Sequence, residues 1–305
     1  MKKASGFEKF AKGQKSGARR EQFRQEKRQV KKEITAQAER KRLELKEKSE
    51  GIERSKITVQ RKAPEQMPLN KYIAHSGLCS RRDAVELIKE GKVKVNGELV
   101  LEPGLKIKEG DEVKVAGKKV EPAPELVYIL LNKPKDYITT TDDPQKRKTV
   151  LDLIKQATKE RVYPVGRLDR NTSGVLLLTN DGELSQKLTH PSNEIKKVYA
   201  VTLDKPLTKA DFEAILKGVE LEDGMAHVDK LAYTDVSDKT QIGVEIHSGR
   251  NRIVRRIFEH LGYDVRALDR VMFAGLTKKN VNRGKYRFLN EKEVRELKFF
   301  GKGKK

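Results

Sequence analysis

Asp169 is the residue of this sequence best placed to do chemistry. It lies between Arg167 and Arg170 at the start of a turn rich in Gly, Asn and Thr, within the segment RVYPVGRLDRNTSGVLLLTNDG. Positive charges on both sides favour the ionised form of a carboxylate, and an ionised carboxylate can act as a nucleophile or as an electrostatic partner. The local pattern also allows a plainer interpretation, in which Asp169 only caps the turn or pairs with its neighbouring arginines.

Two apolar runs are expected to hold the Asp169 loop in place. The run from Val175 to Leu178 follows the loop directly and is closed by the turn signal Asn180-Asp181-Gly182. Earlier in the chain, Leu126 to Leu131 is a continuous apolar run of strand length that ends at Asn132-Lys133-Pro134. The sequence therefore predicts a carboxylate on a loop between core strands.

A second group of chemical residues lies on a predicted helix in the segment GRNRIVRRIFEHLG, residues 249–262. Gly262 is expected to end the helix. The arginines of this helix are expected to project away from the core. Arg255 and Arg256 flank the apolar face almost equally, so angular position does not choose between them. That face is formed by Ile253, Val254, Ile257, Phe258 and Leu261.

Tyr199 is a third candidate. It lies in the predicted strand from Ile195 to Leu203, on the opposite face from Val198 and Ala200. Spacing alone does not separate a functional tyrosine from a half-buried structural one.

Three blocks together resemble a known family. GRLDRNTSGVLLLTNDGEL, HPSNEIKKVYAV and GRNRIVRRIFEHLGY, in this order, resemble the RsuA/RluB group of bacterial ribosomal-RNA pseudouridine synthases, as does NKPKDYITTTDDPQKRKTVLDL ahead of them. The resemblance implies an α+β protein whose catalytic domain has a mixed, mainly antiparallel sheet. It also implies conversion of uridine to pseudouridine, an isomerisation that needs no cofactor and no metal.

The resemblance also implies roles for individual residues. Asp169 would act at the ribose, Tyr199 would pack on the target uracil, and Arg255 would pair with the carboxylate. Leu268, in the block VRALDRVMFAGL, corresponds to a position that lines the uracil pocket in relatives. Contacts with RNA phosphates, or structural roles, are expected for Arg167, Arg250, Arg252 and Arg256.

The block LNKYIAHSGLCSRRDAVELIKEGKVKVNGELV resembles a small RNA-binding domain, the S-four type, named after a ribosomal small-subunit protein. Ser80 and Asp83 have the spacing of a helix N-cap with a short capping box, and Asn96-Gly97 predicts a hairpin turn. Backbone amides at a helix N-terminus favour anions, although any single lysine here can equally belong to a solvated basic face. The residues that the resemblance assigns to RNA binding are Ser80, Arg81, Arg82, Lys92, Lys94 and Asn96.

Composition favours a polyanionic partner, because the formal charge is +22. Residues 1–63 carry 21 Lys and Arg against 9 Asp and Glu, which predicts a basic arm that binds phosphates without sequence preference. No apolar run is long enough to cross a membrane. The one cysteine, Cys79, excludes an internal disulfide, and a reducing cytoplasmic setting is expected.

The predicted organisation has five parts, and the predicted partner is ribosomal RNA or a pre-ribosomal particle bound by a monomer. HPSNEIKKVY looks closer to RluB-type members, which favours the large subunit. Alternatives are a non-catalytic RNA-binding assembly factor on the same scaffold, and a synthase acting on small-subunit ribosomal RNA or transfer RNA. The parts are a basic arm (1–66), the S-four-type domain (67–115), a linker (116–124), the catalytic domain (125–300) and a basic tail (301–305).

Overall fold

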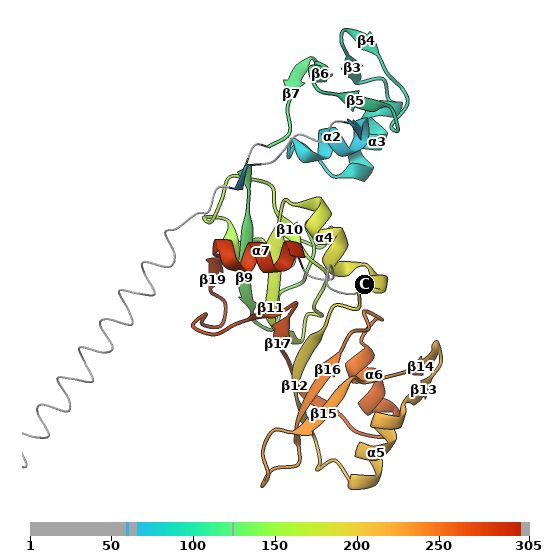
Figure 1. Ribbon diagram of the computed structural model, residues 1–305, viewed down its shortest axis with the longest axis vertical. Helices are drawn as coiled ribbons and strands as arrows, with labels where there is room; N and C mark the ends of the chain where they lie inside the picture. Colours follow the sequence, from blue (N-terminus) through green and yellow to red (C-terminus); the bar gives the residue numbers. More distant parts are fainter. Residues whose placement is uncertain (1–58, 61–65, 124, 300–305) are drawn as a thin grey trace, which may run out of the picture. The chain divides into compact units, whose positions relative to one another are not determined.

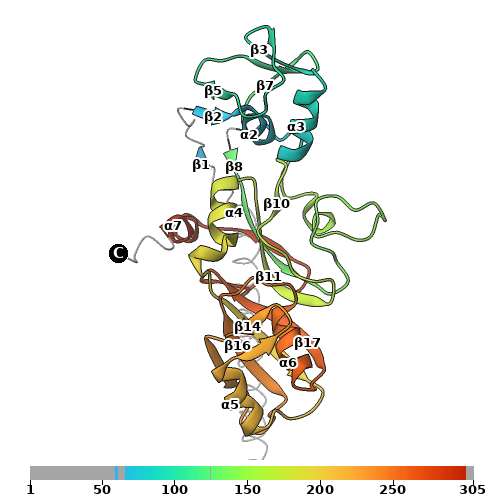
Figure 2. The same cartoon turned by 90° about the vertical axis from the view of Figure 1, so that its right-hand side faces the viewer.

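The structure is a computed structural model that describes residues 59–60, 66–123 and 125–299 (Figures 1 and 2). The predicted basic arm lies outside these residues except for 59–60 and 66, and the predicted tail at 301–305 lies wholly outside them. No helix of the described part is long and apolar enough to span a membrane.

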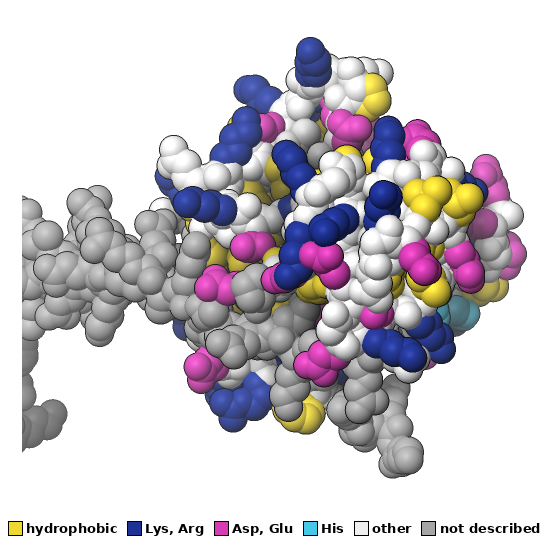
Figure 3. All heavy atoms as spheres, turned by 90° about the horizontal axis from the view of Figure 1, so that it is seen from above, with side chains coloured by type: hydrophobic (Ala, Val, Ile, Leu, Met, Phe, Trp, Pro, Cys, Tyr) yellow, Lys and Arg dark blue, Asp and Glu magenta, His cyan; other side chains and the backbone are white. Residues whose placement is uncertain are grey.

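The N-terminal described region is a small helix and hairpin fold. Helices α2 (Leu69–His75) and α3 (Arg81–Lys89) contact each other, and their apolar sides share one core with residues of the short strands. Lys and Arg side chains gather on the face seen from above in Figure 3. The strands are β2 (Gln66–Pro68), β3 (Val93–Val95), β4 (Glu98–Leu99), β5 (Lys106–Lys108), β6 (Val113–Val115) and β7 (Lys118–Val120), in the orders β2-β5 and β4-β3-β6-β7.

Local signals in this region are confirmed by the structure. Ser80 Oγ accepts a hydrogen bond from the backbone amide of Asp83, and the Ser80 amide donates to Asp83 Oδ2, so the capping box is complete. Asn96 and Gly97 both have positive φ, 51° and 90°, in the turn between β3 and β4. This is the backbone that a tight two-residue hairpin requires.

The second region is built on a nine-stranded mixed sheet, as the α+β interpretation predicted. Its main order is β15-β16-β12-β17-β11-β9-β19, with β10 paired to β11 and β18 to β17. Only the β11–β17 pair is parallel among the described strands of this sheet. The strands are β9 (Tyr128–Lys133), β10 (Tyr163–Pro164), β11 (Thr172–Thr179), β12 (Lys197–Leu203), β15 (Lys230–Tyr233), β16 (Gln241–Ile246), β17 (Val265–Phe273), β18 (Leu276–Thr277) and β19 (Tyr286–Phe288).

The two leucine-rich strands β9 and β11 are fully buried. Leu177 packs with α4 (Gly182–Thr189) and α7 (Glu291–Phe299) in one core cluster, whereas Leu176 packs in another cluster with Ile154 of the 3₁₀ turn η2 (Asp152–Ile154). Because both faces are covered, these strands appear in the sequence as continuous apolar runs rather than as alternating ones.

The other end of the sheet has its own core. Apolar residues of helix α6 (Ile253–His260) share one core cluster with those of β12, β16 and α5 (Lys209–Lys217). Figure 1 shows α5, α6 and β16 in the same part of the fold. A separate hairpin, β13 (Val219–Leu221) with β14 (Gly224–Ala226), contacts α6 through β13. Strand β17 runs between the two cores, so a site at its centre is held from both sides. The remaining pieces are the 3₁₀ turn η3 (Pro191–Asn193) and the two-residue pair β1 (Val59–Gln60) with β8 (Glu125–Leu126).

Candidate functional site

A cavity of about 420 Å³ opens where the Asp169 loop, β12, β17 and the start of α6 meet. Three residues proposed from the sequence to do chemistry or hold the base, Asp169, Tyr199 and Leu268, line this cavity. They come from three separate elements, and together they span about a hundred residues of the sequence. The cavity is also lined by Arg167, Arg250 and Arg252 of the predicted RNA-binding set, and by Thr172, Lys197 and Arg270.

Lys133 holds the backbone of the Asp169 loop. Its side chain is fully buried at the end of β9, and Nζ donates to the carbonyl oxygens of Asp169 at 3.0 Å and Thr172 at 2.8 Å, as well as to those of Pro134 and Arg170. Burial lowers the pKa of Lys133 to about 8. The sequence predicted a turn at Asn-Lys-Pro but assigned this lysine no role. The available signal was a lysine two positions after the end of a strand-length apolar run.

Further contacts fix the two sides of the loop. Thr139 Oγ1 donates to the Leu168 carbonyl at 2.7 Å, and the Asp136 amide donates to the Arg170 carbonyl at 2.9 Å. Arg170 forms an ion pair with Asp136 at 3.3 Å. The Asp169 carboxylate has no hydrogen bond or ion pair with another described side chain, so the loop presents a positioned carboxylate to the cavity.

The predicted orientation of Arg255 was wrong. The sequence placed it facing away from the core, whereas its side chain is buried, with 8% exposed. The side chain lies at the border of the α6 apolar face, and its guanidinium donates to the carbonyl oxygens of Val265 at 2.9 Å and Asn171 at 3.4 Å. Backbone carbonyls therefore compensate the buried charge.

Arg255 thus lies beside the Asp169 loop, held through Asn171. Burial lowers the pKa of Arg255, the charge of Arg252 lowers it further, and the charge of Asp169 opposes both. No ion pair joins Arg255 to Asp169 among the described contacts, so the pairing that the resemblance implied stays a prediction.

Tyr199 lies at the centre of the sheet. In register it is opposite Val244 of β16 and Arg270 of β17. Two residues before it, Lys197 donates from Nζ to the carbonyl oxygens of His247 and Ser248, and so ties β12 to the loop ahead of α6. Burial, followed by the charge of Arg270, lowers the pKa of Lys197 to about 8. The sequence assigned no role to Lys197 or Arg270, because spacing did not show that Arg270 is buried and Lys197 partly buried at the cavity.

Two of the arginines predicted to bind phosphate form ion pairs with one carboxylate, that of Asp223. Arg250 Nε and Arg256 Nη1 donate to Asp223 Oδ2 at 2.9 Å and 3.0 Å, and Asp223 lies in the turn between β13 and β14. The bonds from Arg256 and then Arg250 hold the pKa of Asp223 well below its usual range. Phosphate contact by either arginine would have to replace these ion pairs. Arg252 pairs with Glu259 at 3.0 Å, and Arg167 is exposed.

The predicted RNA-binding residues of the small domain divide into two sets. Ser80 is used by the helix cap, and Asn96 bonds Asp111 and the Glu112 amide across the hairpin. Arg81, Arg82, Lys92 and Lys94 are exposed, and Lys92 pairs with Glu90.

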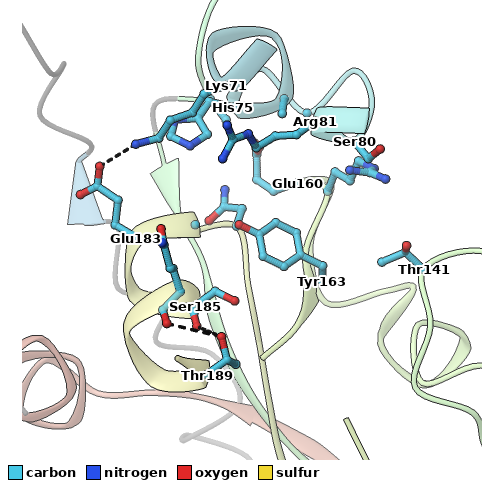
Figure 4. A pocket seen from close by; sticks show the side chains of 17 residues that line it. Lys71, His75, Ser80, Arg81, Thr141, Glu160, Tyr163, Glu183, Ser185 and Thr189 are labelled. Carbon is cyan, nitrogen blue, oxygen red and sulfur yellow. Dashed lines mark hydrogen bonds and ion pairs between the residues drawn. The ribbon is translucent and has the colours of Figure 1, made fainter. Parts of the chain in front are cut away.

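A second cavity, of about 530 Å³, is lined by Arg81 and His75 together with Arg161 and Tyr163 (Figure 4). Lys71 at its edge forms an ion pair with Glu183 at 3.0 Å. This second cavity is lined by none of the residues that the sequence predicted to do chemistry or to hold the base. No cluster of His, Cys, Asp and Glu able to hold a metal ion is present within the described ranges.

Comparisons with known proteins identify the family of this chain. Residues 127–260 match the family described as RNA pseudouridylate synthase, and residues 67–113 match the S4 domain. The chain is similar to the ribosomal large subunit pseudouridine synthase B of Bacillus subtilis (strain 168), with 45% identity over 75% of this chain and 94% of the relative. It is similar to the dual-specificity RNA pseudouridine synthase RluF of Escherichia coli (strain K12), with 36% identity over 75% of this chain and 77% of the relative. A crystal structure of a pseudouridylate synthase aligns with 76% of this chain and 99% of its own, at 30% identity and a TM-score of 0.55.

Proposed function

This chain belongs to the S4-containing RNA pseudouridine synthases, as its motifs predicted, and on that premise we propose that it isomerises a uridine of large-subunit ribosomal RNA with Asp169 as the reacting carboxylate. The observation that carries the proposal is the convergence of Asp169, Tyr199 and Leu268 on one cavity from three separate elements. The large-subunit target is supported by the Bacillus subtilis relative and its printed description.

The reaction moves one bond. The bond from ribose C1′ to uracil N1 breaks, the ring turns over, and a bond from C1′ to C5 forms. C5 loses a proton and N1 gains one, so no group or electron is transferred to or from the enzyme overall. A base stacked in RNA cannot reach a cavity of this kind, so the uridine has to be flipped out at a cost of a few kcal/mol.

The residues that line the cavity or hold its Asp169 loop have roles that fit their places in the fold. Asp169 acts at the ribose and is held there by the Lys133 hydrogen bonds to its loop. Arg255, anchored on Asn171 and Val265, supplies positive charge beside that loop. Tyr199 stacks on the uracil, and Leu268 contributes an apolar wall.

RNA binding uses two basic regions, one in the S4 domain and one at the cavity. In the S4 domain the exposed Arg81 and Arg82 at the start of α3 add side-chain charge to the positive end of the helix dipole. At the cavity, Arg250 and Arg256 exchange Asp223 for phosphate oxygens. These contacts offset the cost of flipping, and the unpaired bases and shape of the RNA select the site.

The test is a comparison of Asp169→Asn with wild type on ribosomal RNA. The substitution preserves size and removes the charge, so pseudouridine formation should fall below detection while the dissociation constant for RNA stays within about threefold. The matched control is Asp136→Asn, an exposed carboxylate paired with Arg170 in the same region, which should retain most of the activity. Residual activity of Asp169→Asn above a few per cent of wild type would contradict the assigned role.

A second substrate has one observation in its favour. The Escherichia coli relative is described as dual-specificity. We therefore include a second RNA target as an alternative, tested by assaying transfer RNA and both ribosomal RNAs with the same enzyme preparation.

A further inference from the structure

Arg270 is a buried cation at the wall of the cavity with an unused hydrogen-bond donor. Its side chain is 2% exposed, and in register it lies between Gly174 of β11 and Tyr199 of β12. Nε donates to the Val175 carbonyl at 2.8 Å, and the guanidinium lies 4.7 Å from the centre of the Phe273 ring. Nη2 is buried and has no hydrogen-bond partner among the described residues.

Within the described part of the chain, no carboxylate pairs with this guanidinium. Burial lowers the pKa of Arg270, and the opposing contribution comes from the Tyr199 side chain, through its electrostatic interaction and its hydrogen bond. A guanidinium stays protonated in proteins, so the positive charge persists inside the fold. An unpaired buried charge costs several kcal/mol. Such a charge at a cavity wall indicates that a ligand completes its surroundings.

The neighbouring groups favour an anionic ligand with acceptor oxygens. The charge of Arg270 contributes to lowering the pKa of both Lys133 and Lys197, yet the amines of these lysines already donate to backbone carbonyls. Arg270 Nη2 therefore remains as the free cationic donor of this cluster. Thr172, also at the cavity wall and 2% exposed, has a buried Oγ1 without a hydrogen-bond partner.

The proposed reaction generates an anion that matches these groups. When the C1′–N1 bond breaks, its electron pair stays on the uracil ring and is shared by N1 and the two carbonyl oxygens. We propose that Arg270 Nη2 donates a hydrogen bond to a uracil carbonyl oxygen and stabilises the negative charge of the ring until the C1′–C5 bond forms. This inference rests on the proposed function. It adds Arg270 to the catalytic residues as the group that stabilises the leaving base, with the Thr172 hydroxyl as a neutral neighbour.

The test varies the donor and the leaving group together. Arg270→Lys keeps the charge but loses the planar fork of donors. Its single-turnover rate is measured on an RNA fragment carrying the target uridine and on the same fragment carrying 5-fluorouridine, whose base is a more stable anion and needs less help. In each case the loss of the original nucleoside is followed. The uridine rate should fall about 100-fold, as for removal of one oxyanion donor, and the 5-fluorouridine rate at least tenfold less.

Controls separate chemistry from structure. Arg287→Lys makes the same exchange at a half-buried arginine bound to Glu293, and should leave both rates unchanged. Arg270→Gln serves as a second variant if the lysine protein does not fold, and the same contrast between the two RNAs is expected. Affinity for RNA should stay within threefold in all variants.

Three results would overturn the inference. One is an equal fold-loss on both RNAs, and another is a loss explained entirely by weaker RNA binding. The third comes from the Tyr199→Phe background: if Arg270→Lys has no further effect there, Arg270 only positions the phenol. The proposed function is judged separately, because wild type must form pseudouridine from the uridine fragment whatever the Arg270 variants do.

Discussion

Two adjacent arginines on α6 have opposite surroundings. Arg255 is buried and donates to the backbone carbonyls of Val265 and Asn171, while Arg256 is partly exposed and binds the Asp223 carboxylate. Helical spacing could not separate them, since both border the apolar face. What separates them is the surrounding backbone: Arg255 donates to carbonyl oxygens of β17 and of the Asp169 loop, whereas Arg256 donates to the Asp223 side chain.

The Arg255 and Arg256 variants should therefore fail in different ways. Arg255→Gln removes the charge beside the Asp169 loop, and kcat should fall at least tenfold with little change in RNA affinity. Arg256→Gln should weaken RNA binding severalfold and leave kcat near wild type. Steady-state kinetics and filter binding on the same RNA distinguish the two, and exchanged phenotypes would contradict the assignment.

The buried lysines should make stability depend on pH. Because burial lowers the pKa of Lys197 to about 8 from 10.5, the folded state loses this proton at lower pH than the unfolded state. The cost of burying the charge is fully present below pH 8 and is relieved as the pH rises towards 10.5. The contribution of Lys197 to the free energy of unfolding therefore increases between about pH 8 and pH 10.5.

Lys197→Met should remove this dependence. Between pH 8 and 9.5 the free energy of unfolding of wild type should rise relative to the variant, by at most about 1.4 kcal/mol per pH unit. The neighbouring Lys196, whose pKa is raised by its bond to Glu245, provides the control variant Lys196→Met, which should run parallel to wild type over this range. Urea unfolding at several pH values measures all three, and parallel curves for Lys197→Met would contradict the account.

At the scale of elements, the site depends on the parallel pairing of β11 with β17. Gly174 lies at this junction with φ +113°, and a Cβ there would lie 2.6 Å from the Arg270 amide nitrogen and closer still to its carbonyl oxygen. Only glycine allows the two strands to approach at this point.

Gly174→Ala should therefore be strongly destabilising, by at least about 2 kcal/mol, from backbone strain and the clash together. Gly243→Ala is the matched control on β16: its added Cβ would meet the Thr234 Cγ2 at 3.2 Å, a side-chain tip that can move, so the cost should stay below about 1 kcal/mol. Thermal unfolding of both variants tests this. Equal melting temperatures for the two variants would contradict the close approach of β11 and β17.

Local sequence patterns predicted several of these elements but not the contacts between distant segments. The capping box at Ser80 and the Asn96-Gly97 hairpin depend on residues that are close together in the sequence, so the sequence alone predicted them. The pairing of β11 with β17 joins residues nearly a hundred positions apart, which no local period encodes. For the same reason the burial of Arg255 and the clamp by Lys133 were not predicted, since each depends on carbonyl groups from distant segments.

At the scale of the whole molecule, a chain of charge +22 places the Asp169 carboxylate in a cavity bordered by basic residues. Family resemblance, rather than composition, specified the reaction, because charge alone fits any polyanion. The fold then explains how separate motifs form one site, since β12, β17 and the Asp169 loop meet at the centre of the sheet. The predicted basic arm lies outside the described residues, and its phosphate-binding role stays a prediction.

The most direct test of the central claim is a map of pseudouridines in both ribosomal RNAs from cells that lack this protein, complemented with wild type or with Asp169→Asn. The account predicts that a site in large-subunit RNA is lost, that wild type restores it, and that Asp169→Asn does not. Survival of every site without the protein, or restoration by Asp169→Asn, would contradict it.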